Sequence, residues 1–408
     1  MSFFLSAEEL RSATLKITGS KSESNRLLIL QALYEKLTIQ NLSNSDDTKV
    51  LQTALSSSES TIDIHHAGTS MRFLTTYLAM TPGFDGVLTG SARMQQRPIK
   101  VLVDALRQLG AEIEYAGNEG YPPLRIKGVS PKSNTVRIAA NVSSQYLSSL
   151  LLTGSSFPNG INLELEGELT SVPYLKMTLS LLEALGAETE LTDSYVKVSQ
   201  VEDSASMSFT VESDWSSASY FYSIMAMGGP DRIRLHSYKP DSLQGDSKLV
   251  ELFAPLGVVS EFNSEDHSLS LSLNSECNLP KVYTADLVDT PDLAQTIAVC
   301  CFGLGIGCEL SGLHTLKIKE TDRLEALKAE LEKFGASVAI TQDHLSLKPS
   351  SGIKSGVSVA TYQDHRMAMA FAPLAMKTSL AIEEPEVVSK SYPEFWDDLE
   401  TLGFQIKK

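Results

Sequence analysis

The pattern of apolar positions predicts six helices that begin in a similar way. Leu324, Leu327, Leu331 and Phe334 follow a 3-4-3 spacing, which is typical of one buried helix face. Comparable apolar series follow five other short polar segments. These helix starts lie at residues 19–26, 67–72, 141–145, 290–292, 317–323 and 364–366.

Basic residues occur at four of these six predicted helix starts. In Lys317-Ile-Lys-Glu-Thr-Asp-Arg323, Thr321 is the expected N-cap, with Lys319 and Glu320 just ahead of the helix and Arg323 in its first turn. The N-terminus of a helix attracts anions, so cations placed there weaken the helix unless an anion binds. A single case indicates a solvated helix start with a local salt bridge. Four cases favour convergence on a shared anion.

A second pattern repeats along the whole chain. Helical segments ending in Leu-Gly-Ala or a similar run precede β-like stretches, and a glycine in the left-handed C′ position explains each ending. The spacings between these glycines are 76, 71, 78 and 68 residues, and 408 residues divided by six gives 68. Six βαβαββ-sized units would fill the chain, with a degenerate first unit in which residues 51–57 replace the signature. Such helix ends are common in α/β proteins, but near-even spacing favours a repeat. The glycines are Gly110, Gly186, Gly257, Gly335 and Gly403.

Charge and composition limit the partners. A net charge of −16 argues against nucleic acid or a membrane surface, so an anionic ligand must be attracted by locally clustered cations. The N-terminal residues do not resemble a signal peptide, and no apolar run approaches membrane-spanning length. We therefore expect a soluble cytoplasmic protein. The cysteines indicate a reduced compartment and no structural zinc; they are Cys277, Cys300, Cys301 and Cys308.

Six motifs, in order and at consistent spacing, closely resemble those of the EPSP synthase family. They are Gly19-Ser-Lys-Ser-Glu-Ser-Asn-Arg26, Ala67-Gly-Thr-Ser-Met-Arg72, Arg93-Met-Gln-Gln-Arg-Pro98, Val142-Ser-Ser-Gln145, Lys319-Glu-Thr-Asp-Arg323 and Asp364-His-Arg-Met-Ala-Met369. The resemblance covers residues 15–393. It implies an α/β fold, a two-domain inside-out α/β barrel of six βαβαββ units, three per domain. The expected domains are 19–212, and 1–18 with 213–408, with the active site in the cleft between them.

The resemblance also implies a reaction. The enolpyruvyl group of phosphoenolpyruvate would pass to the 5-hydroxyl of shikimate 3-phosphate, with release of phosphate. Neither a metal nor another cofactor is expected, the only partners are the small-molecule substrates, and the protein is expected to be a monomer. The reaction needs proton transfer in both directions, which carboxylates and a lysine can perform if their environments separate their pKa values.

Residue roles follow from the matching motif positions. Glu320 resembles the proton donor, Asp292 the group that accepts the hydroxyl proton, and Lys21 the lysine that contacts both substrates. The expected shikimate 3-phosphate residues are Lys21, Ser22, Arg26, Ser143, Ser144, Gln145, Ser171, Tyr174, Asp292, Thr315 and Lys319. The expected phosphoenolpyruvate residues are Lys21, Gly68, Arg97, Gln145, Arg323, His365, Arg366 and Lys390.

Some of these residues have simpler interpretations. Helix or turn capping explains Ser143, Ser144 and Ser171 as well as ligand binding does. His65 and His66 are not expected to bind a metal, since no third ligand stands at suitable spacing. Three positions depart from the family pattern: His66 replaces a usual Asn, Phe73 a usual Pro and Thr315 a usual Asn, which puts one phosphate contact in doubt.

Two alternatives remain. An enolpyruvyl transferase acting on UDP-N-acetylglucosamine has the same fold but carries a loop cysteine near its site, whereas residues 93–98 contain none. A catalytically silent anion-binding protein is disfavoured by Lys21, Asp292, Glu320 and Arg366, because binding alone does not require a glutamate in a phosphate site.

Overall fold

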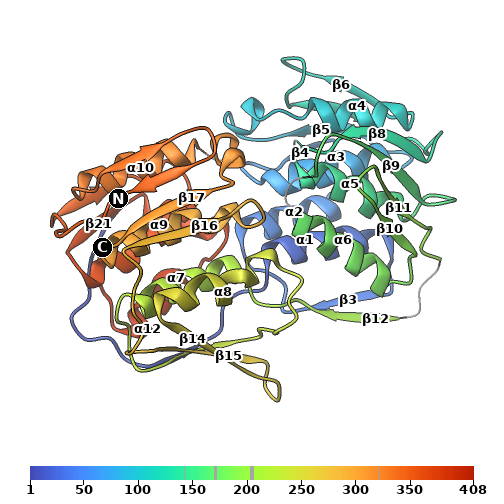
Figure 1. Cartoon of the computed structure of the whole chain (residues 1–408). Coiled ribbons are helices and arrows are strands. Elements are labelled where there is room, and N and C mark those ends of the chain that lie inside the picture. Colours follow the sequence, from blue (N-terminus) through green and yellow to red (C-terminus); the bar gives the residue numbers. More distant parts are fainter. Residues whose placement is uncertain (142, 170–171, 203–205, 320) are drawn as a thin grey trace. The chain divides into compact units, whose positions relative to one another are not determined.

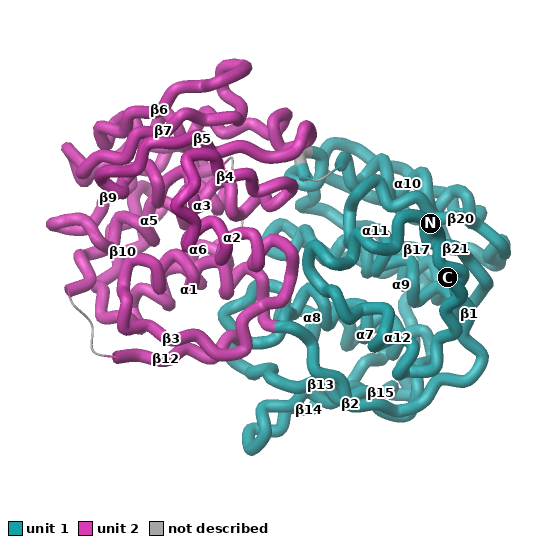
Figure 2. Tube along the Cα trace, turned by 180° about the vertical axis from the view of Figure 1, so that it is seen from behind, with its two compact units in different colours: residues 1–18, 212–408 teal, residues 19–211 magenta. Residues whose placement is uncertain are grey.

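The computed structural model describes residues 1–141, 143–169, 172–202, 206–319 and 321–408 (Figure 1). The chain folds into two compact units (Figure 2). Unit 1 comprises residues 1–18 and 212–408, and unit 2 comprises residues 19–211. The chain thus passes from unit 1 to unit 2 after Thr18 and returns after Val211.

Unit 2 alternates helices with short strands. Its strands are β3 (Leu37–Gln40), β4 (Thr61–Asp63), β5 (Asp85–Thr89), β6 (Glu112–Tyr115), β7 (Leu124–Lys127), β8 (Thr135–Ala139), β9 (Ile161–Glu166), β10 (Thr189–Leu191), β11 (Tyr195–Val198) and β12 (Met207–Thr210). Its helices are α1 (Lys21–Leu33), α2 (Asp46–Ser56), α3 (Gly68–Ala79), the 3₁₀ helix η1 (Met94–Gln96), α4 (Lys100–Gln108), α5 (Ser144–Gly154) and α6 (Val172–Ala184).

Unit 1 has the same alternation. Its strands are β1 (Ser2–Ser6), β2 (Ala13–Leu15), β13 (Ile233–His236), β14 (Val258–Asn263), β15 (Ser268–Leu273), β16 (Val282–Asp286), β17 (Gly307–Ser311), β18 (Val338–Ile340), β19 (Leu345–Leu347), β20 (Val357–Val359), β21 (Leu380–Glu383) and β22 (Gln405–Lys407). Its α-helices are α7 (Trp215–Ala226), α8 (Leu249–Phe253), α9 (Ala294–Gly303), α10 (Arg323–Lys333), α11 (His365–Phe371) and α12 (Phe395–Leu402). Its 3₁₀ helices are η2 (Gly245–Lys248), η3 (Ala254–Leu256), η4 (Pro291–Leu293), η5 (His314–Ile318), η6 (Ala372–Met376) and η7 (Pro385–Lys390).

The strands of the described residues form six sheets, and five of them share one topology. In the sheet β16-β17-β19-β18, the first two strands are parallel, and β19 pairs antiparallel with both β17 and β18. The helices α9 and α10 connect these strands, which makes a βαβαββ unit. The sheets β4-β5-β7-β6 and β8-β9-β11-β10 repeat this order, as do β2-β13-β15-β14 and β20-β21-β1-β22. The predicted α/β fold of six repeated units is therefore confirmed.

The degenerate first repeat has a structural explanation. Among the described residues its sheet consists of β3 and β12, paired in parallel from Leu37 with Met207 to Gln40 with Thr210. The chain leaves α2 at Ser56 and enters β4 of the next sheet at Thr61. No β-hairpin is inserted in that described stretch, which is why the Leu-Gly-Ala ending is missing there.

The five signature glycines end their helices as predicted. Gly110, Gly186, Gly257, Gly335 and Gly403 have φ values of 92°, 95°, 87°, 98° and 104°. These are left-handed conformations that glycine adopts without a steric cost, so the chain can turn from each helix into the next strand.

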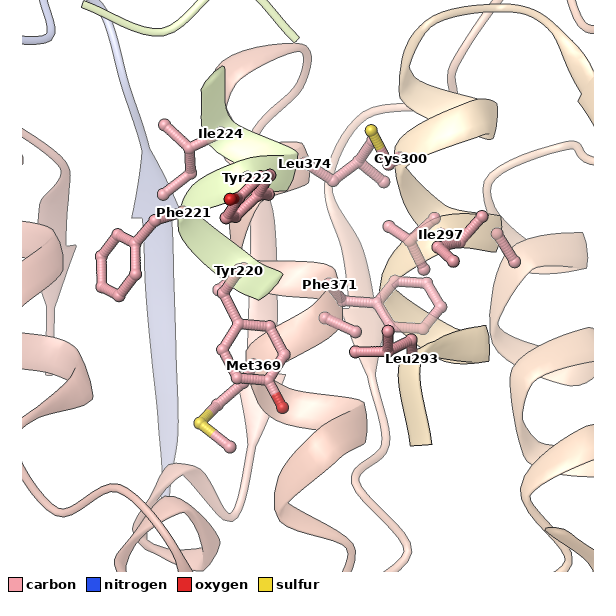
Figure 3. Packing of buried hydrophobic residues seen from close by; sticks show 14 of the residues in the cluster. Tyr220, Phe221, Tyr222, Ile224, Leu293, Ile297, Cys300, Met369, Phe371 and Leu374 are labelled. Atoms are coloured by element: carbon pink, nitrogen blue, oxygen red, sulfur yellow. The ribbon is translucent and has the colours of Figure 1, made fainter. Parts of the chain in front are cut away.

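The helices, not the sheets, fill the interior. Helices α7, α9 and α11 in unit 1 are buried around almost their whole circumference, as are α3 and α5 in unit 2. A helix that is apolar on every side belongs in a core. In unit 1 these helices pack through side chains such as Tyr220, Ile297 and Phe371 (Figure 3). The arrangement brings helix N-termini together in each unit. No helix of the described residues has the length and hydropathy to cross a membrane.

Candidate active site

A carboxylate among three cations forms the centre of the candidate site in unit 1. The Asp292 carboxylate accepts hydrogen bonds from Arg323 Nη1 at 2.8 Å and Arg366 Nη2 at 3.0 Å, and Lys319 Nζ lies 3.6 Å away. Asp292 belongs to η4, which begins with Pro291 and leads into α9. The remaining exposure of the Asp292 side chain, 15%, leaves it accessible to a ligand.

Arg323 is held by a second carboxylate. Its Nε donates to Asp364 Oδ2 at 2.6 Å, and its side chain is only 2% exposed. Asp364 is completely buried and also caps α11, since its Oδ1 accepts from the backbone N–H of Arg366 at 2.9 Å. One aspartate therefore holds the side chain of Arg323 and the backbone of Arg366.

The N-cap prediction for α10 was wrong by one residue. The cap is Asp322, whose carboxylate accepts from the backbone N–H of Glu325 at 3.2 Å, and not Thr321. The physical reason is that both residues can cap a helix, and the chain turns so that the carboxylate faces the free N–H group. Arg323 is consequently the first residue of the helix.

Other predicted residues of unit 1 lie at the start of α11 or on η5. Lys390 Nζ donates to the carbonyl oxygen of Gln363 at 2.7 Å, next to the first turn of α11. His365 is 3% exposed, with Nδ1 3.9 Å from Asp364 Oδ1. The hydroxyl of Thr315, on η5, is buried without a hydrogen-bond partner among the described residues. Glu320 lies outside the described residues.

In unit 2, four helix N-termini are linked by contacts. Lys21, the first residue of α1, pairs with Asp47 in the first turn of α2 at 3.6 Å. Ser70, on the first turn of α3, donates to the Asp47 carbonyl oxygen at 3.1 Å. Gln145, on the first turn of α5, donates to Thr69 Oγ1 at 3.4 Å. Three of the predicted helix starts, at residues 19–26, 67–72 and 141–145, are thus linked within this unit together with the start of α2. Their convergence on a shared anion stays a prediction.

Gly68 allows an arginine to lie on the N-terminus of α3. A Cβ atom added to Gly68 would stand 2.4 Å from Arg97 Nη1, closer than such contacts are found. The missing side chain therefore admits the Arg97 guanidinium to the positive end of the helix, a position that makes physical sense when an anion binds beside it.

Arg26 is buried and makes several hydrogen bonds within unit 2, whereas an arginine that only binds a ligand would keep donors free for it. Its three guanidinium nitrogens donate within the unit, and its exposed fraction is 2%. The acceptors are Thr178 Oγ1, Ser22 O, Ser148 Oγ and Tyr174 O. Burial lowers the pKa of Arg26 to about 10. The side chain ties α1, α5 and α6 together, so its predicted substrate contact stays a prediction.

Of the two described serines for which capping was an alternative, one caps a helix. Ser143 caps α5, because its Oγ accepts from the N–H of Gln145 at 3.3 Å. Ser144 is the buried first residue of that helix. Ser171 lies outside the described residues.

Two clusters of site residues are thus present: the residues around Asp292 in unit 1 and the linked helix N-termini in unit 2. Several residues next to these clusters were not assigned a role from the sequence. Asp47, Ser216, Asp246 and Asp364 all contact predicted site residues or each other. Asp364 stands inside a recognised motif and could have been found there. The other three carry no local signal, since aspartates and serines near helix starts usually serve as caps.

The arrangement suits chemistry on a strongly anionic substrate. Guanidinium groups bind carboxylates and phosphates through paired hydrogen bonds, and Asp292 offers a base among them. No cluster of three or more metal-binding side chains occurs in the described part of the chain.

Comparisons with known proteins all point to the same enzyme family. A family model described as EPSP synthase (3-phosphoshikimate 1-carboxyvinyltransferase) matches residues 49–399. A 3-phosphoshikimate 1-carboxyvinyltransferase of Bacteroides fragilis (strain YCH46) is 45% identical over 411 residues, covering 100% of this chain and 99% of that protein. One from Shewanella pealeana is 34% identical, covering 96% and 97%.

Solved structures show the same fold. An EPSP synthase from Acinetobacter baumannii matches with a TM-score of 0.78 at 19% identity, covering 100% of both chains. An enolpyruvyl transferase from Streptomyces tendae matches with a TM-score of 0.74 at 15% identity, covering 100% of this chain and 98% of the other.

Proposed function

This chain belongs to the EPSP synthase family, the 3-phosphoshikimate 1-carboxyvinyltransferases, and we infer from that membership how its residues work. The protein transfers the enolpyruvyl group of phosphoenolpyruvate to the 5-hydroxyl of shikimate 3-phosphate, and phosphate leaves. This transfer belongs to the biosynthesis of chorismate and the aromatic amino acids.

The observation that best supports a catalytic centre is the position of Asp292. Arg323 and Arg366 donate hydrogen bonds to this carboxylate, Lys319 lies nearby, and the side chain stays partly accessible at a helix start. A site that only bound anions would gain nothing from a carboxylate at its centre, because the carboxylate repels the ligand. A base that must accept a proton beside an anionic substrate explains the arrangement.

We assign the proton transfers accordingly. Asp292 accepts the proton of the attacking 5-hydroxyl as the oxygen bonds to C2 of phosphoenolpyruvate, and Glu320 supplies a proton to C3. The tetrahedral adduct then loses phosphate: C3 returns a proton to the Glu320 carboxylate, the C2–C3 double bond re-forms, and the leaving phosphate takes the proton held by Asp292. Lys21 and the arginines stabilise the negative charge that these steps concentrate.

We assign substrate-binding roles to residues of both clusters. In unit 1, Arg323, Arg366 and Lys390 provide cations for phosphoenolpyruvate, and Lys319 for shikimate 3-phosphate. In unit 2, Arg97 beside Gly68 is assigned to phosphoenolpyruvate, and Lys21 and Gln145 to both substrates. The remaining assignments are Ser22, Arg26, Ser143, Ser144, Ser171, Tyr174 and Thr315 for shikimate 3-phosphate, and His365 for phosphoenolpyruvate. The interdomain cleft, the monomeric state and the cytoplasmic location stay predictions.

Phosphate release tests the function. The full chain is incubated with phosphoenolpyruvate and either shikimate 3-phosphate or UDP-N-acetylglucosamine, with and without a chelator. We expect release with shikimate 3-phosphate only, and the same rate with chelator present. Release only with UDP-N-acetylglucosamine would favour the alternative transferase, and no release from folded protein with either acceptor would favour a silent anion binder.

Replacing the partner of Lys21 should have a moderate effect. Asp47→Asn removes the carboxylate that holds the ammonium group at 3.6 Å, with Asp47 8% and Lys21 20% exposed. We expect kcat/KM to fall about tenfold, since a partly buried charged contact contributes roughly 1.5 kcal/mol and 1.4 kcal/mol is a factor of ten.

Asp85→Asn is the matched control. Asp85 pairs with Arg125 at 2.6 Å in the same unit, but both side chains are more than half exposed. It should leave kcat/KM within about twofold of the unsubstituted protein, because exposed ion pairs contribute little. Equal effects of the two substitutions would argue against a role for Asp47 in positioning Lys21.

A further inference from the structure

A buried carboxylate behind the unit 1 site has no role in the assignments above. Asp246, on the 3₁₀ helix η2, is 4% exposed and accepts a hydrogen bond through Oδ2 from the hydroxyl of Ser216. A carboxylate that loses its hydration needs compensating hydrogen bonds or ion pairs.

Ser216 connects this carboxylate to a predicted substrate-binding arginine. Its Oγ accepts from Arg366 Nη2 at 3.3 Å, and the same nitrogen donates to Asp292 Oδ2 at 3.0 Å. A serine hydroxyl has one hydrogen to donate and two lone pairs that accept. When Asp246 is ionised it can only accept, so the Ser216 hydrogen points to Asp246 and a lone pair faces Arg366.

The geometry of this pair is held by a second set of contacts. Gln244, two residues before Asp246, accepts from the backbone N–H of Trp215 at 3.0 Å and donates to the carbonyl oxygen of Ser213 at 2.8 Å. These bonds fasten the chain that carries Asp246 to the N-terminus of α7, where Ser216 lies. They keep the backbone of Asp246 close to that of Ser216.

We propose that Asp246 and Ser216 are positioning residues that orient the Arg366 guanidinium for the anionic groups of phosphoenolpyruvate. The proposal rests on the function inferred above. Neither residue touches the substrate in this scheme; each acts through Arg366. Without the serine acceptor, the guanidinium loses one of its fixed contacts and samples other orientations. Ordering it on binding then costs free energy, which weakens the affinity for phosphoenolpyruvate.

The titration of Asp246 supports a pH-dependent contribution. Burial raises the pKa of Asp246 to about 7, and the negative charges of Asp292 on η4 and Asp214 at the start of α7 add to this rise. The positive charge of Arg366 on α11 and the hydrogen bond from the Ser216 hydroxyl lower the pKa and oppose the rise. Above this pH the ionised carboxylate fixes the serine hydrogen. Below it, the protonated carboxyl can donate to Ser216, and the serine hydrogen is released toward Arg366, where it repels the cation.

Steady-state kinetics with both substrates test the proposal. Ser216→Ala and Asp246→Asn should each raise KM for phosphoenolpyruvate about tenfold, with KM for shikimate 3-phosphate within about twofold and kcat within about threefold. Ser216→Thr retains the hydroxyl and should restore most of the affinity. In the unsubstituted protein, KM for phosphoenolpyruvate should fall as the pH rises through 7. In the Asp246→Asn variant, this additional pH dependence should be absent.

Ser219→Ala is the matched control. Ser219 lies one turn further along α7, where its hydroxyl donates to the backbone carbonyl of Ser216 and lies 3.1 Å from Thr296 Oγ1. This substitution should leave both KM values unchanged.

The outcomes separate the proposal from the function on which it rests. If Ser216→Ala leaves KM for phosphoenolpyruvate unchanged, or raises both KM values equally, the positioning role is overturned. Ser216→Ala removes one hydroxyl and decides the point even if Asp246→Asn does not fold. If the unsubstituted protein releases no phosphate with shikimate 3-phosphate, the inferred function fails first, before any variant is compared.

Discussion

Asp292→Asn should reduce kcat about 10³-fold while the protein stays folded. Asparagine has the same shape but cannot accept the proton of the 5-hydroxyl, and a positioned general base typically contributes 10²- to 10⁴-fold. KM for phosphoenolpyruvate should not rise, because the change removes a negative charge that competes with the substrate for Arg323 and Arg366. Phosphate release measured against each substrate gives both quantities.

The matched control for this change is Asp289→Asn. Asp289 lies three residues earlier and pairs with Lys248 at 3.1 Å, where the side chains are 35% and 48% exposed. The same loss of charge there should leave kcat within about twofold. A kcat for Asp292→Asn within tenfold of the unsubstituted protein would remove Asp292 from the role of base.

Arg323→Met should lower both stability and activity by large amounts. The side chain is 2% exposed and joins Asp292 to Asp364, whose own side chain is fully buried. Removing one partner of a buried ion pair leaves an uncompensated charge and costs about 3–5 kcal/mol. Urea unfolding should show the loss in the transition of unit 1, and phosphate release should fall below about a thousandth of the original rate.

Two further variants separate these effects. Arg234→Met breaks a comparable pair with Asp266 at the surface of the same unit, where both side chains are more than a third exposed. This substitution should lower the free energy of unfolding by less than about 1 kcal/mol, because exposed ion pairs contribute little to stability. Adding Asp364→Asn to Arg323→Met should recover part of the stability and none of the activity. Equal destabilisation by Arg323→Met and Arg234→Met would contradict the assignment of a buried network.

Much of the fold could be predicted because its signals are local. The ends of five helices at Gly110, Gly186, Gly257, Gly335 and Gly403 depend on left-handed backbone conformations that favour glycine in any context. Their near-even spacing therefore indicates the repeat from the sequence alone. The basic helix starts were likewise visible, since Lys and Arg are out of place at the positive end of a helix unless something anionic binds there.

The pairing of distant strands could not be read in this way. β12 completes the first sheet beside β3, about 170 residues away along the chain, and β1 inserts between β21 and β22 at the opposite end of the sequence. Short strands carry little pattern of their own, so their partners depend on long-range packing.

At the site, the residue types came from the sequence and their partners from the tertiary structure. Lys21, Asp292, Arg323 and Arg366 were identified by motifs that match a known family. Their links to Asp47, Asp364 and Ser216, and from Ser216 on to Asp246, depend on which helix starts meet inside each unit. A charge can be recognised from its local sequence, but its orientation is set by the buried groups that packing brings within hydrogen-bond distance.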